Sequence, residues 1–198
     1  MPRLVLASTS PRRRELLQVL GLPFEVVPST FDEGSIPTEG LHPHEWVMRL
    51  AEGKARDVAA RTPGHALVIG ADTTVILDSE YLNKPQGDDD ARRMLRHLSG
   101  QTHTVYTGLC IVETQNGMIA QIATDFAQTF VTFAPLSDAV IDAYVATGEP
   151  RDKAGAYGIQ GKALAFIPGV NGDYFNVVGL PLFTLCRMLA PWGVSPWH

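Results

Sequence analysis

The sequence predicts an α/β domain built on a mixed β-sheet. Segments with the apolar spacing of strands alternate with segments of helical spacing, which is typical of α/β proteins. Residues 65–72 form a nearly continuous apolar run, as expected for a strand covered on both faces. Residues 101–133 are strand-like except at Gln115-Asn116-Gly117, a strong hairpin turn signal that adds an antiparallel pair.

The first half of the chain alternates strands and helices. Its predicted elements are, in order, a strand at residues 3–7, a helix at 10–20, a strand at 24–28, a helix at 44–60 and a strand at 65–77. Ser10 is a good N-cap for the first helix, Pro11 suits the first helical position, and Gly21 is a natural stop. The second helix places Val47 and Leu50 on one apolar stripe.

The second half continues this alternation. Its predicted elements are a turn at residues 78–79, a helix at 88–100, the hairpin at 101–133, a helix at 136–148, a strand at 164–167 and a helix that begins within 179–189. The three aspartates at 88–90 suit a helix start, and Gly100 suits a helix end. The length of 198 residues fits a single domain over residues 1–198, or at most two small lobes.

Composition excludes several classes of protein. The net charge of -5 and the pI of about 5.6 argue against a general nucleic-acid-binding surface. No apolar run reaches the ~18 residues of a membrane span, and the apolar start is too short for a secretory signal, so we expect a cytoplasmic protein with no membrane partner. Cys110 and Cys186 lack metal-ligand spacing and are expected to be small buried apolar residues.

Three arginines, Arg12 to Arg14, follow the predicted helix start at Ser10. The N-terminus of a helix carries a partial positive charge, so cations reduce stability there. The same terminus offers free backbone N–H groups and, with the hydroxyls of Ser8 and Ser10, suits an anion such as phosphate. Arginine forks match phosphate oxygens, so the cluster predicts a polyanion site with Arg14 as its expected spectator. A solvated basic turn remains the alternative.

Four further residues strengthen this prediction. Lys54 falls on the apolar stripe of its helix, where it either extends to the surface or reaches a charged partner. Asp72 ends the apolar run at residues 65–72, and the carboxyl end of a buried strand is where α/β sheets bind ligands, although Asp72 could also cap a turn. Glu33 and Lys84 lie in loops. Two carboxylates with several cations indicate a phosphate site assisted by a hard cation such as Mg²⁺.

The order of the motifs resembles one family along nearly the whole chain. The matching segments are "LASTSPRRRELL", "FDEG", "RLAEGKA", "GADT", "KP", "DKAGAYGIQG" and "NGDYFNVVGLPL". The set resembles the Maf family of nucleoside triphosphate pyrophosphatases, which was first associated with septum formation. The resemblance implies an elongated mixed sheet with helices packed around it, similar to the inosine triphosphatases. It also implies hydrolysis of nucleoside triphosphates to the monophosphate and pyrophosphate.

The resemblance implies a role for each candidate residue. Asp72 matches the catalytic carboxylate, and Glu33 with Asp72 would hold a divalent cation, Mg²⁺ or Mn²⁺. The residues implied to bind the phosphates are Ser8, Ser10, Arg12, Arg13, Lys54 and Lys84. The residues implied to influence substrate choice are Arg12, Thr73 and Gln160. Thr74 and Asn83 depart from the family pattern, and a homodimer agrees with the family.

The base preference is expected to depend on Gln160. The resemblance implies two groups within the family, one acting on dTTP and UTP and the other on 7-methyl-GTP. The segment "GAYGIQG" resembles the first group, whereas the second tends to carry glutamate at the position of Gln160. A uracil or thymine edge offers an N–H beside a carbonyl, which suits the amide of Gln160. We therefore expect pyrimidine nucleoside triphosphates, with modified pyrimidine nucleotides included. Gln160 could instead only support a glycine loop.

Three rival functions remain open. The chain could be a nucleotide-binding regulator of septum formation with little turnover, or a pyrophosphatase of the 7-methyl-GTP type. The presence of Glu33, Lys54, Asp72 and Lys84 favours catalysis over sensing. An RNA-binding module is disfavoured because the chain is acidic and lacks interleaved aromatic and basic residues.

Overall fold

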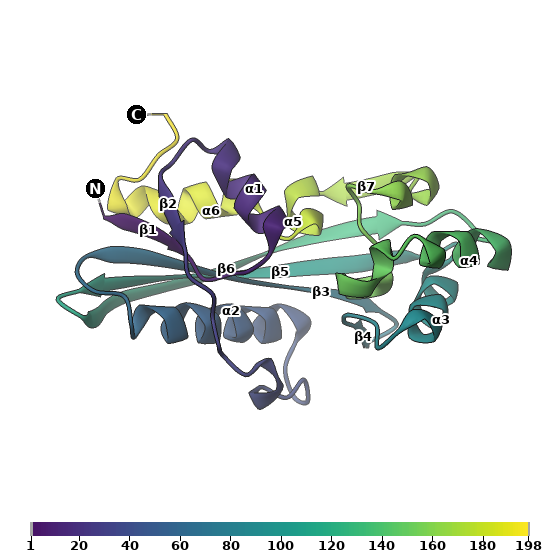
Figure 1. Ribbon diagram of the computed structural model, residues 1–198, viewed down its shortest axis with the longest axis horizontal. Helices are drawn as coiled ribbons and strands as arrows, with labels where there is room; N and C mark the ends of the chain where they lie inside the picture. Colours follow the sequence, from purple (N-terminus) through teal and green to yellow (C-terminus); the bar gives the residue numbers. More distant parts are fainter. Residues whose placement is uncertain (1, 198) are drawn as a thin grey trace. The chain divides into compact units, whose positions relative to one another are not determined.

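A computed structural model describes residues 2–197 (Figure 1). The described residues divide into two compact units. Unit 1 contains the chain up to Asp72, Thr107–Ala127 and the chain from Gly179 onward, and unit 2 contains Thr73–Tyr106 and Gln128–Val178. A single domain over residues 1–198 stays a prediction. Within residues 2–197, no helix combines the length and apolar character that crossing a membrane requires.

The strands belong to one mixed sheet. Their order is β2-β1-β3-β5-β6-β7, with β4 paired to β3. The strands are β1 (Arg3–Leu6), β2 (Phe24–Val26), β3 (Ala66–Leu77), β4 (Glu80–Leu82), β5 (Thr102–Gln115), β6 (Met118–Thr132) and β7 (Gly169–Gly172). The strands β1, β2 and β3 are parallel, whereas β4 and β7 pair antiparallel with β3 and β6. The predicted mixed sheet with surrounding helices is confirmed.

In unit 1, helices cover both faces of the strands. Figure 1 shows α1 (Pro11–Val19) and α6 (Leu182–Leu189) on one side and α2 (Pro43–Ala59) on the other. The buried stripe of α2 includes Val47 and Leu50, as its spacing predicts. Cys110 lies in the same core, and burial raises the pKa of its thiol to about 12. Cys186 is only partly buried, because it lies on α6 outside the fully covered stripe.

Two glycines allow α2 to lie directly on the sheet. A methyl group at Gly70 of β3 would overlap the carbonyl oxygen of Ala51, and one at Gly108 of β5 would overlap the backbone of Val47. The close approach therefore requires strand residues without a side chain. It sets the distance between the α2 backbone and the part of β3 around Gly70.

Replacing Gly70 with alanine is expected to destabilise the protein by about 1–3 kcal/mol, because the helix backbone must move away from the sheet. The matched control is Gly169→Ala in β7, where the nearest atom to an added methyl group is a Thr132 side-chain carbon at 4.0 Å. Guanidinium unfolding measures both variants. Equal stability of the two would contradict the close-packing argument.

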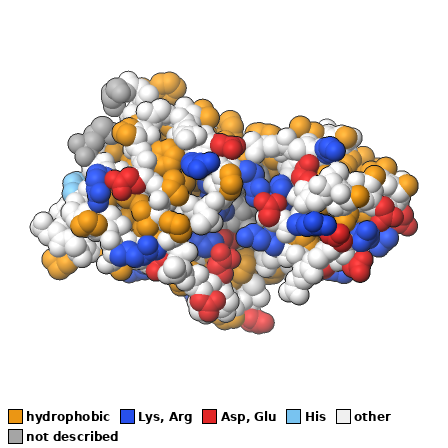
Figure 2. All heavy atoms as spheres, in the orientation of Figure 1, with side chains coloured by type: hydrophobic (Ala, Val, Ile, Leu, Met, Phe, Trp, Pro, Cys, Tyr) orange, Lys and Arg blue, Asp and Glu red, His pale blue; other side chains and the backbone are white. Residues whose placement is uncertain are grey.

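In unit 2, three helices accompany the strands. They are α3 (Asp88–Leu98), α4 (Asp138–Ala146) and α5 (Tyr174–Val178). Ion pairs join α3 to α4: Arg92 Nε is 2.7 Å from Asp142 Oδ1, and Arg96 Nε is 2.7 Å from Asp138 Oδ1. Figure 2 likewise shows basic and acidic side chains beside one another on the visible face. Opposite charges are therefore interspersed on that face.

An aromatic cluster forms part of the core of unit 2. The rings of His103, Phe133 and Tyr157 pack edge to face, with centroids 4.9–5.3 Å apart. His103 Nε2 lies 2.8 Å from the Tyr157 hydroxyl, whereas its Nδ1 has no hydrogen-bond partner among the described residues. Burial lowers the pKa of His103 to about 3. The ring is therefore neutral at physiological pH.

The buried His103 predicts a loss of stability in acid. Its pKa is lower in the folded chain than the unfolded value of about 6.5, so the unfolded state binds the proton first. Its contribution is complete above pH ~6.5 and decreases by up to about 1.4 kcal/mol per pH unit as the pH falls toward about 3. Denaturant unfolding at several pH values should give a smaller pH dependence for His103→Asn. An unchanged slope would contradict this assignment.

The predicted strand at residues 164–167 is wrong. The structure forms a 3-10 helix at Lys162–Phe166, in which Ala163 and Phe166 are buried and Leu164 is exposed. Burial at a spacing of three residues fits a 3-10 helix, not a strand. The strand β7 was not predicted, because its sequence "GVNG" holds one apolar residue and its pairing with β6 defines it.

Candidate functional site

The site in unit 1 begins where β1 ends and its parallel pairing with β3 stops. Asp72 does not end a strand, as its apolar run suggested: it lies within β3, which continues to Leu77. In the register of β1 and β3, Leu6 is opposite Ile69, so Ser8 follows the end of β1 and Asp72 lies three residues beyond the last residue of β3 that pairs with β1. Ser8 is buried, and its hydroxyl oxygen accepts a hydrogen bond from the backbone N–H of Ser10 at 3.2 Å. The carboxyl end of a parallel strand, here β1, is the usual ligand position in α/β sheets.

The first helix, α1, starts shortly after the end of β1. The hydroxyl oxygen of Ser10 accepts a hydrogen bond from the backbone N–H of Arg13 at 3.5 Å, which makes Ser10 the predicted N-cap. The helix has no acidic residue in its first turn, and Pro11 occupies its first position. Its positive end is therefore not offset by acidic residues in that turn.

Lys54 lies between two carboxylates. Its Nζ is 2.7 Å from Glu33 Oε1 and also contacts Asp72 Oδ1. The Lys54 and Asp72 side chains are only 12% and 11% exposed, whereas Glu33 is 56% exposed. Of the two alternatives for Lys54, the structure shows the inward one: the lysine reaches a charged partner instead of solvent.

The loop that carries Glu33 is held against α2. Asp57 accepts hydrogen bonds from the hydroxyl of Ser29 at 2.8 Å and from the backbone N–H of Thr30 at 2.7 Å. The ring of Phe31 lies over Gly53, where a methyl group would overlap it. These contacts hold the loop against Gly53, the residue before Lys54 on α2. They explain locally why Glu33 meets Lys54.

Arg13 belongs to the same cluster. Its Nε donates a hydrogen bond to the carbonyl oxygen of Gly179 at 2.8 Å. Burial lowers the pKa of Arg13 and the neighbouring Arg12 lowers it further, while Asp72 and Glu33 act in the opposite direction. Arg13 is thus near enough to Arg12, Asp72 and Glu33 to interact with them electrostatically. Arg14 is exposed, and its spectator role stays a prediction.

Asp72 has an altered proton affinity. Burial raises the pKa of its carboxyl group, and the nearby Glu33 adds to the rise. Lys54 and Arg13 act against the rise, because their positive charges favour the carboxylate. A buried acid with a raised pKa beside cationic groups is a common property of catalytic sites.

Glu33 and Asp72 are the two carboxylates that could hold a divalent cation. Both carboxylates converge on a single positive charge, the Lys54 ammonium. Within residues 2–197 no group of three or more His, Cys, Asp and Glu side chains is placed to hold a metal. Mg²⁺ commonly takes one or two carboxylates and completes its shell with water and phosphate oxygens. A divalent cation held by Glu33 and Asp72 would therefore need further ligands from water and from a bound phosphate.

Three of the predicted residues belong to unit 2. Thr73 directly follows Asp72 on β3, and Lys84 and Gln160 have exposed side chains without hydrogen-bond partners among the described residues. Thr74 donates a hydrogen bond to Asn83 Oδ1 at 3.0 Å. The two residues that depart from the family pattern are therefore partners, and the bond fixes the residue before Lys84.

Some contributors were not predicted from the sequence. Asp57 and Phe31 hold the Glu33 loop, and the carbonyl of Gly179 accepts from Arg13. The one sequence signal was Gly53, since glycine within a helix is unfavourable unless it serves packing. Nothing in the sequence pattern indicated Gly179.

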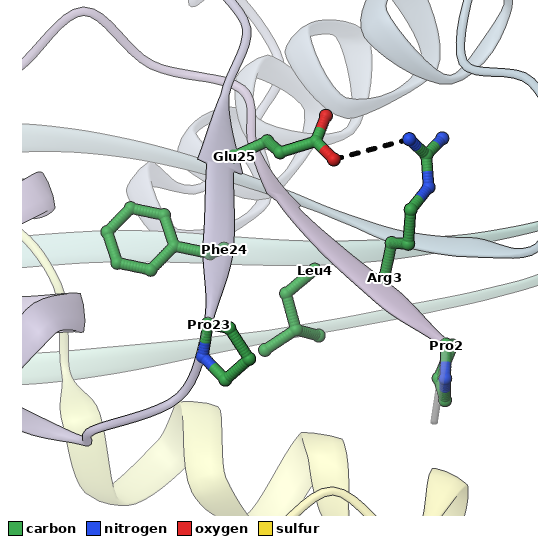
Figure 3. A pocket seen from close by; sticks show the side chains of 6 residues that line it. All are labelled: Pro2, Arg3, Leu4, Pro23, Phe24 and Glu25. Atoms are coloured by element: carbon green, nitrogen blue, oxygen red, sulfur yellow. Dashed lines mark hydrogen bonds and ion pairs between the residues drawn. The ribbon is translucent and has the colours of Figure 1, made fainter.

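A separate hollow in unit 1 does not belong to the site. It has a volume of about 300 Å³ and is lined by Pro2, Arg3, Leu4, Pro23, Phe24 and Glu25 (Figure 3). Its two charged side chains pair with each other, with Arg3 Nη1 3.2 Å from Glu25 Oε1. None of the predicted site residues lines it.

The fold and site define an α/β protein in which a basic helix start lies near a buried acid–lysine pair. The sequence matches the family described as "Maf-like protein" over residues 3–192, and the chain belongs to this family. The resemblance inferred from the motifs is confirmed.

Two curated relatives are similar to the whole chain, and both are named "dTTP/UTP pyrophosphatase". The relative from Moorella thermoacetica is 52% identical over 197 residues, covering 100% of this chain and 98% of its own. That from Symbiobacterium thermophilum is 49% identical over 193 residues, covering 98% and 95%. A solved HAM1 protein from Coxiella burnetii is 18% identical with a TM-score of 0.48, covering 96% of this chain and 100% of its own.

Proposed function

We propose that this chain hydrolyses pyrimidine nucleoside triphosphates, dTTP and UTP above all, to the monophosphate and pyrophosphate with a divalent cation. The enzyme class, a nucleoside triphosphate pyrophosphatase, is that of its curated relatives. The observation that carries the proposal is the buried contact of Lys54 with Asp72, within electrostatic range of Arg13. Modified pyrimidine nucleotides belong to the proposed substrate range.

The triphosphate tail would satisfy the positive charges of the site. Ser8, Ser10, Arg12 and Arg13 would bind phosphate oxygens at the start of α1, where backbone N–H groups already favour anions. Lys54 and Lys84 would add ammonium groups. A bound polyanion removes the mutual repulsion of the arginines, which explains why they are tolerated at a positive helix end.

Asp72 is proposed to orient and deprotonate the attacking water. Its buried carboxylate has a raised pKa, and a base is most effective when its pKa lies near the working pH. Arg12, Arg13 and Lys54 would stabilise charge on the departing pyrophosphate. Glu33 and Asp72 would hold the cation, Mg²⁺ or Mn²⁺, which when bound supplies further positive charge to the phosphate oxygens.

Gln160 is proposed to read the base, together with Thr73 and Arg12. Its amide offers a donor and an acceptor, as a uracil edge requires. Gln160→Glu is expected to lower kcat/KM for UTP relative to 7-methyl-GTP by about fivefold or more, since a mismatched buried polar pair costs about 1–3 kcal/mol. The control is Gln101→Glu, another exposed glutamine of unit 2, which should keep the wild-type ratio. An unchanged ratio in Gln160→Glu would reject base reading by this residue.

Pyrophosphate release tests the proposed activity directly. The protein is first treated with a chelator to remove metal. It is then assayed with dTTP, UTP, CTP, 5-methyl-UTP and 7-methyl-GTP, each with Mg²⁺, with Mn²⁺ and without metal. We expect turnover of dTTP and UTP only with metal. Tight nucleotide binding with negligible turnover would instead indicate a regulator, and a preference for 7-methyl-GTP would assign the other group of the family.

A further inference from the structure

We propose that Glu149 and Tyr144 are positioning residues for base selection, because together they hold the loop Gly158–Lys162 that carries Gln160. The specificity part of this inference rests on the proposed function, in which Gln160 reads the base. The anchoring part rests only on contacts within unit 2. None of the roles assigned above involves either residue.

The two residues hold the loop at both ends. Glu149 Oε2 accepts a hydrogen bond from the backbone N–H of Lys162 at 3.0 Å. Glu149 Oε1 accepts one from the hydroxyl of Tyr144 at 2.8 Å. The same hydroxyl oxygen accepts a hydrogen bond from the backbone N–H of Gly158 at 3.1 Å. One carboxylate and one phenol thus fix the first and last residues of the loop.

The loop also lies directly on these side chains. A methyl group at Gly161 would overlap the carboxylate of Glu149. One at Gly158 would lie 2.6 Å from Lys153 Cε and 3.3 Å from Glu149 Oε1. The two glycines of "GIQG" therefore allow the backbone to approach its anchor closely. Both glycines lie against the Glu149 carboxylate, which a side chain at either position would meet.

The anchor is itself fixed in place. Lys153 Nζ donates a hydrogen bond to the backbone carbonyl of Glu149 at 2.7 Å. Arg151, two residues after Glu149, forms hydrogen bonds of 2.9 and 3.1 Å with the two carboxylate oxygens of Asp88 on α3. The ring of Tyr144 packs edge to face on Phe166, with centroids 5.2 Å apart. Glu149 is thus a firm support for the loop.

Within the loop, the side chains of Gln160 and Lys162 are exposed, and Ile159 between Gly158 and Gln160 is buried. Ile159 is buried at 3% exposure, whereas Gln160 is exposed and its side chain has no hydrogen-bond partner among residues 2–197. Just before the loop, Gly155 and Ala156 have φ of 69° and 58°, and the left-handed conformation is unfavourable for alanine. Such strain persists where surrounding contacts fix the backbone, as at binding sites.

Only a carboxylate fills the role of Glu149. Its two oxygens accept from two donors, the Tyr144 hydroxyl and the Lys162 N–H. A glutamine has one acceptor oxygen, so Glu149→Gln leaves one donor without its acceptor. Tyr144→Phe keeps the ring but removes the hydroxyl that contacts both Glu149 and Gly158. Both variants should loosen the loop without altering Gln160 itself.

The specificity test compares kcat/KM for UTP and 7-methyl-GTP with Mg²⁺. We expect Glu149→Gln and Tyr144→Phe each to reduce the UTP preference by about fivefold or more. In a Gln160→Ala background, adding either change should leave the ratio as it is, because a positioning residue acts through the side chain that it positions. Glu80→Gln, which removes a carboxylate paired with Arg93 in the same unit, should keep the wild-type ratio.

Hydrogen exchange tests the anchoring independently of activity. The amides of Gly158 and Lys162 should exchange faster in both variants and at the wild-type rate in Glu80→Gln. Where Glu149→Gln does not fold, Tyr144→Phe supplies both measurements. Unchanged exchange overturns the anchoring, and an equal loss of preference with and without Gln160 overturns the positioning role. A wild-type ratio in Gln160→Ala alone rejects base reading, the proposed function of that residue, and with it the specificity role of Glu149.

Discussion

Asp72→Asn is expected to lower kcat for UTP hydrolysis by about 10²–10⁴-fold, the usual contribution of a general base. The asparagine keeps the size of the side chain but cannot take a proton from water. It also removes the negative charge that pairs with Lys54, so nucleotide binding should be retained or strengthened. Pyrophosphate release at saturating UTP with Mg²⁺ measures the effect. KM should change far less than kcat.

The matched control for this substitution is Asp78→Asn. Asp78 is exposed in the turn that follows β3, and its φ of 50° is one that asparagine readily adopts. This variant should keep the wild-type kcat. Near-full turnover in Asp72→Asn would show that the carboxylate is not the base, and the mechanism would then need another acceptor for the proton.

Lys54→Met is expected to destabilise the protein by about 3 kcal/mol at neutral pH, because breaking a buried ion pair leaves an uncompensated charge. Burial already raises the pKa of Asp72, and loss of the ammonium removes the main opposing influence. The folded pKa then lies further above the unfolded value of about 3.9, so stability is greatest in acid and falls as the pH rises between these two values. The deficit relative to wild type should therefore shrink as the pH is lowered.

Urea unfolding from pH 4 to pH 8 checks this prediction. Lys162→Met, which changes an exposed lysine side chain, should alter stability by less than about 0.5 kcal/mol. Turnover of UTP should also decline in Lys54→Met, because the lysine is proposed to bind phosphate. A stability deficit that does not depend on pH would contradict the coupling of Lys54 with Asp72.

Much of the fold and part of the site could be predicted from local patterns. The apolar run that ends at Asp72 predicted a buried strand, and Ser10-Pro11 predicted the start of α1, because both signals lie within a few neighbouring residues. Lys54 on an apolar stripe indicated two outcomes. The choice between them depends on Glu33 and Asp72, which are distant in sequence.

Other features could not be predicted because their causes are not local. Asp57 holds Thr30 across 27 residues, and no periodicity marks such a contact. The strand β7 exists through its pairing with β6, not through its own composition. The segment after Gly161 is apolar enough for a strand, but burial of Ala163 and Phe166 selects a 3-10 helix.

The helix α2 holds site residues that are far apart in the sequence. It carries Lys54 itself and, through Asp57, sets the place of the loop that bears Glu33. Any shift of α2 relative to Gly70 and Gly108 would displace the Lys54 and Glu33 side chains together. Thermostable variants are therefore best designed with substitutions on surfaces away from α2, keeping the α2 face that packs on Gly70 and Gly108 unchanged.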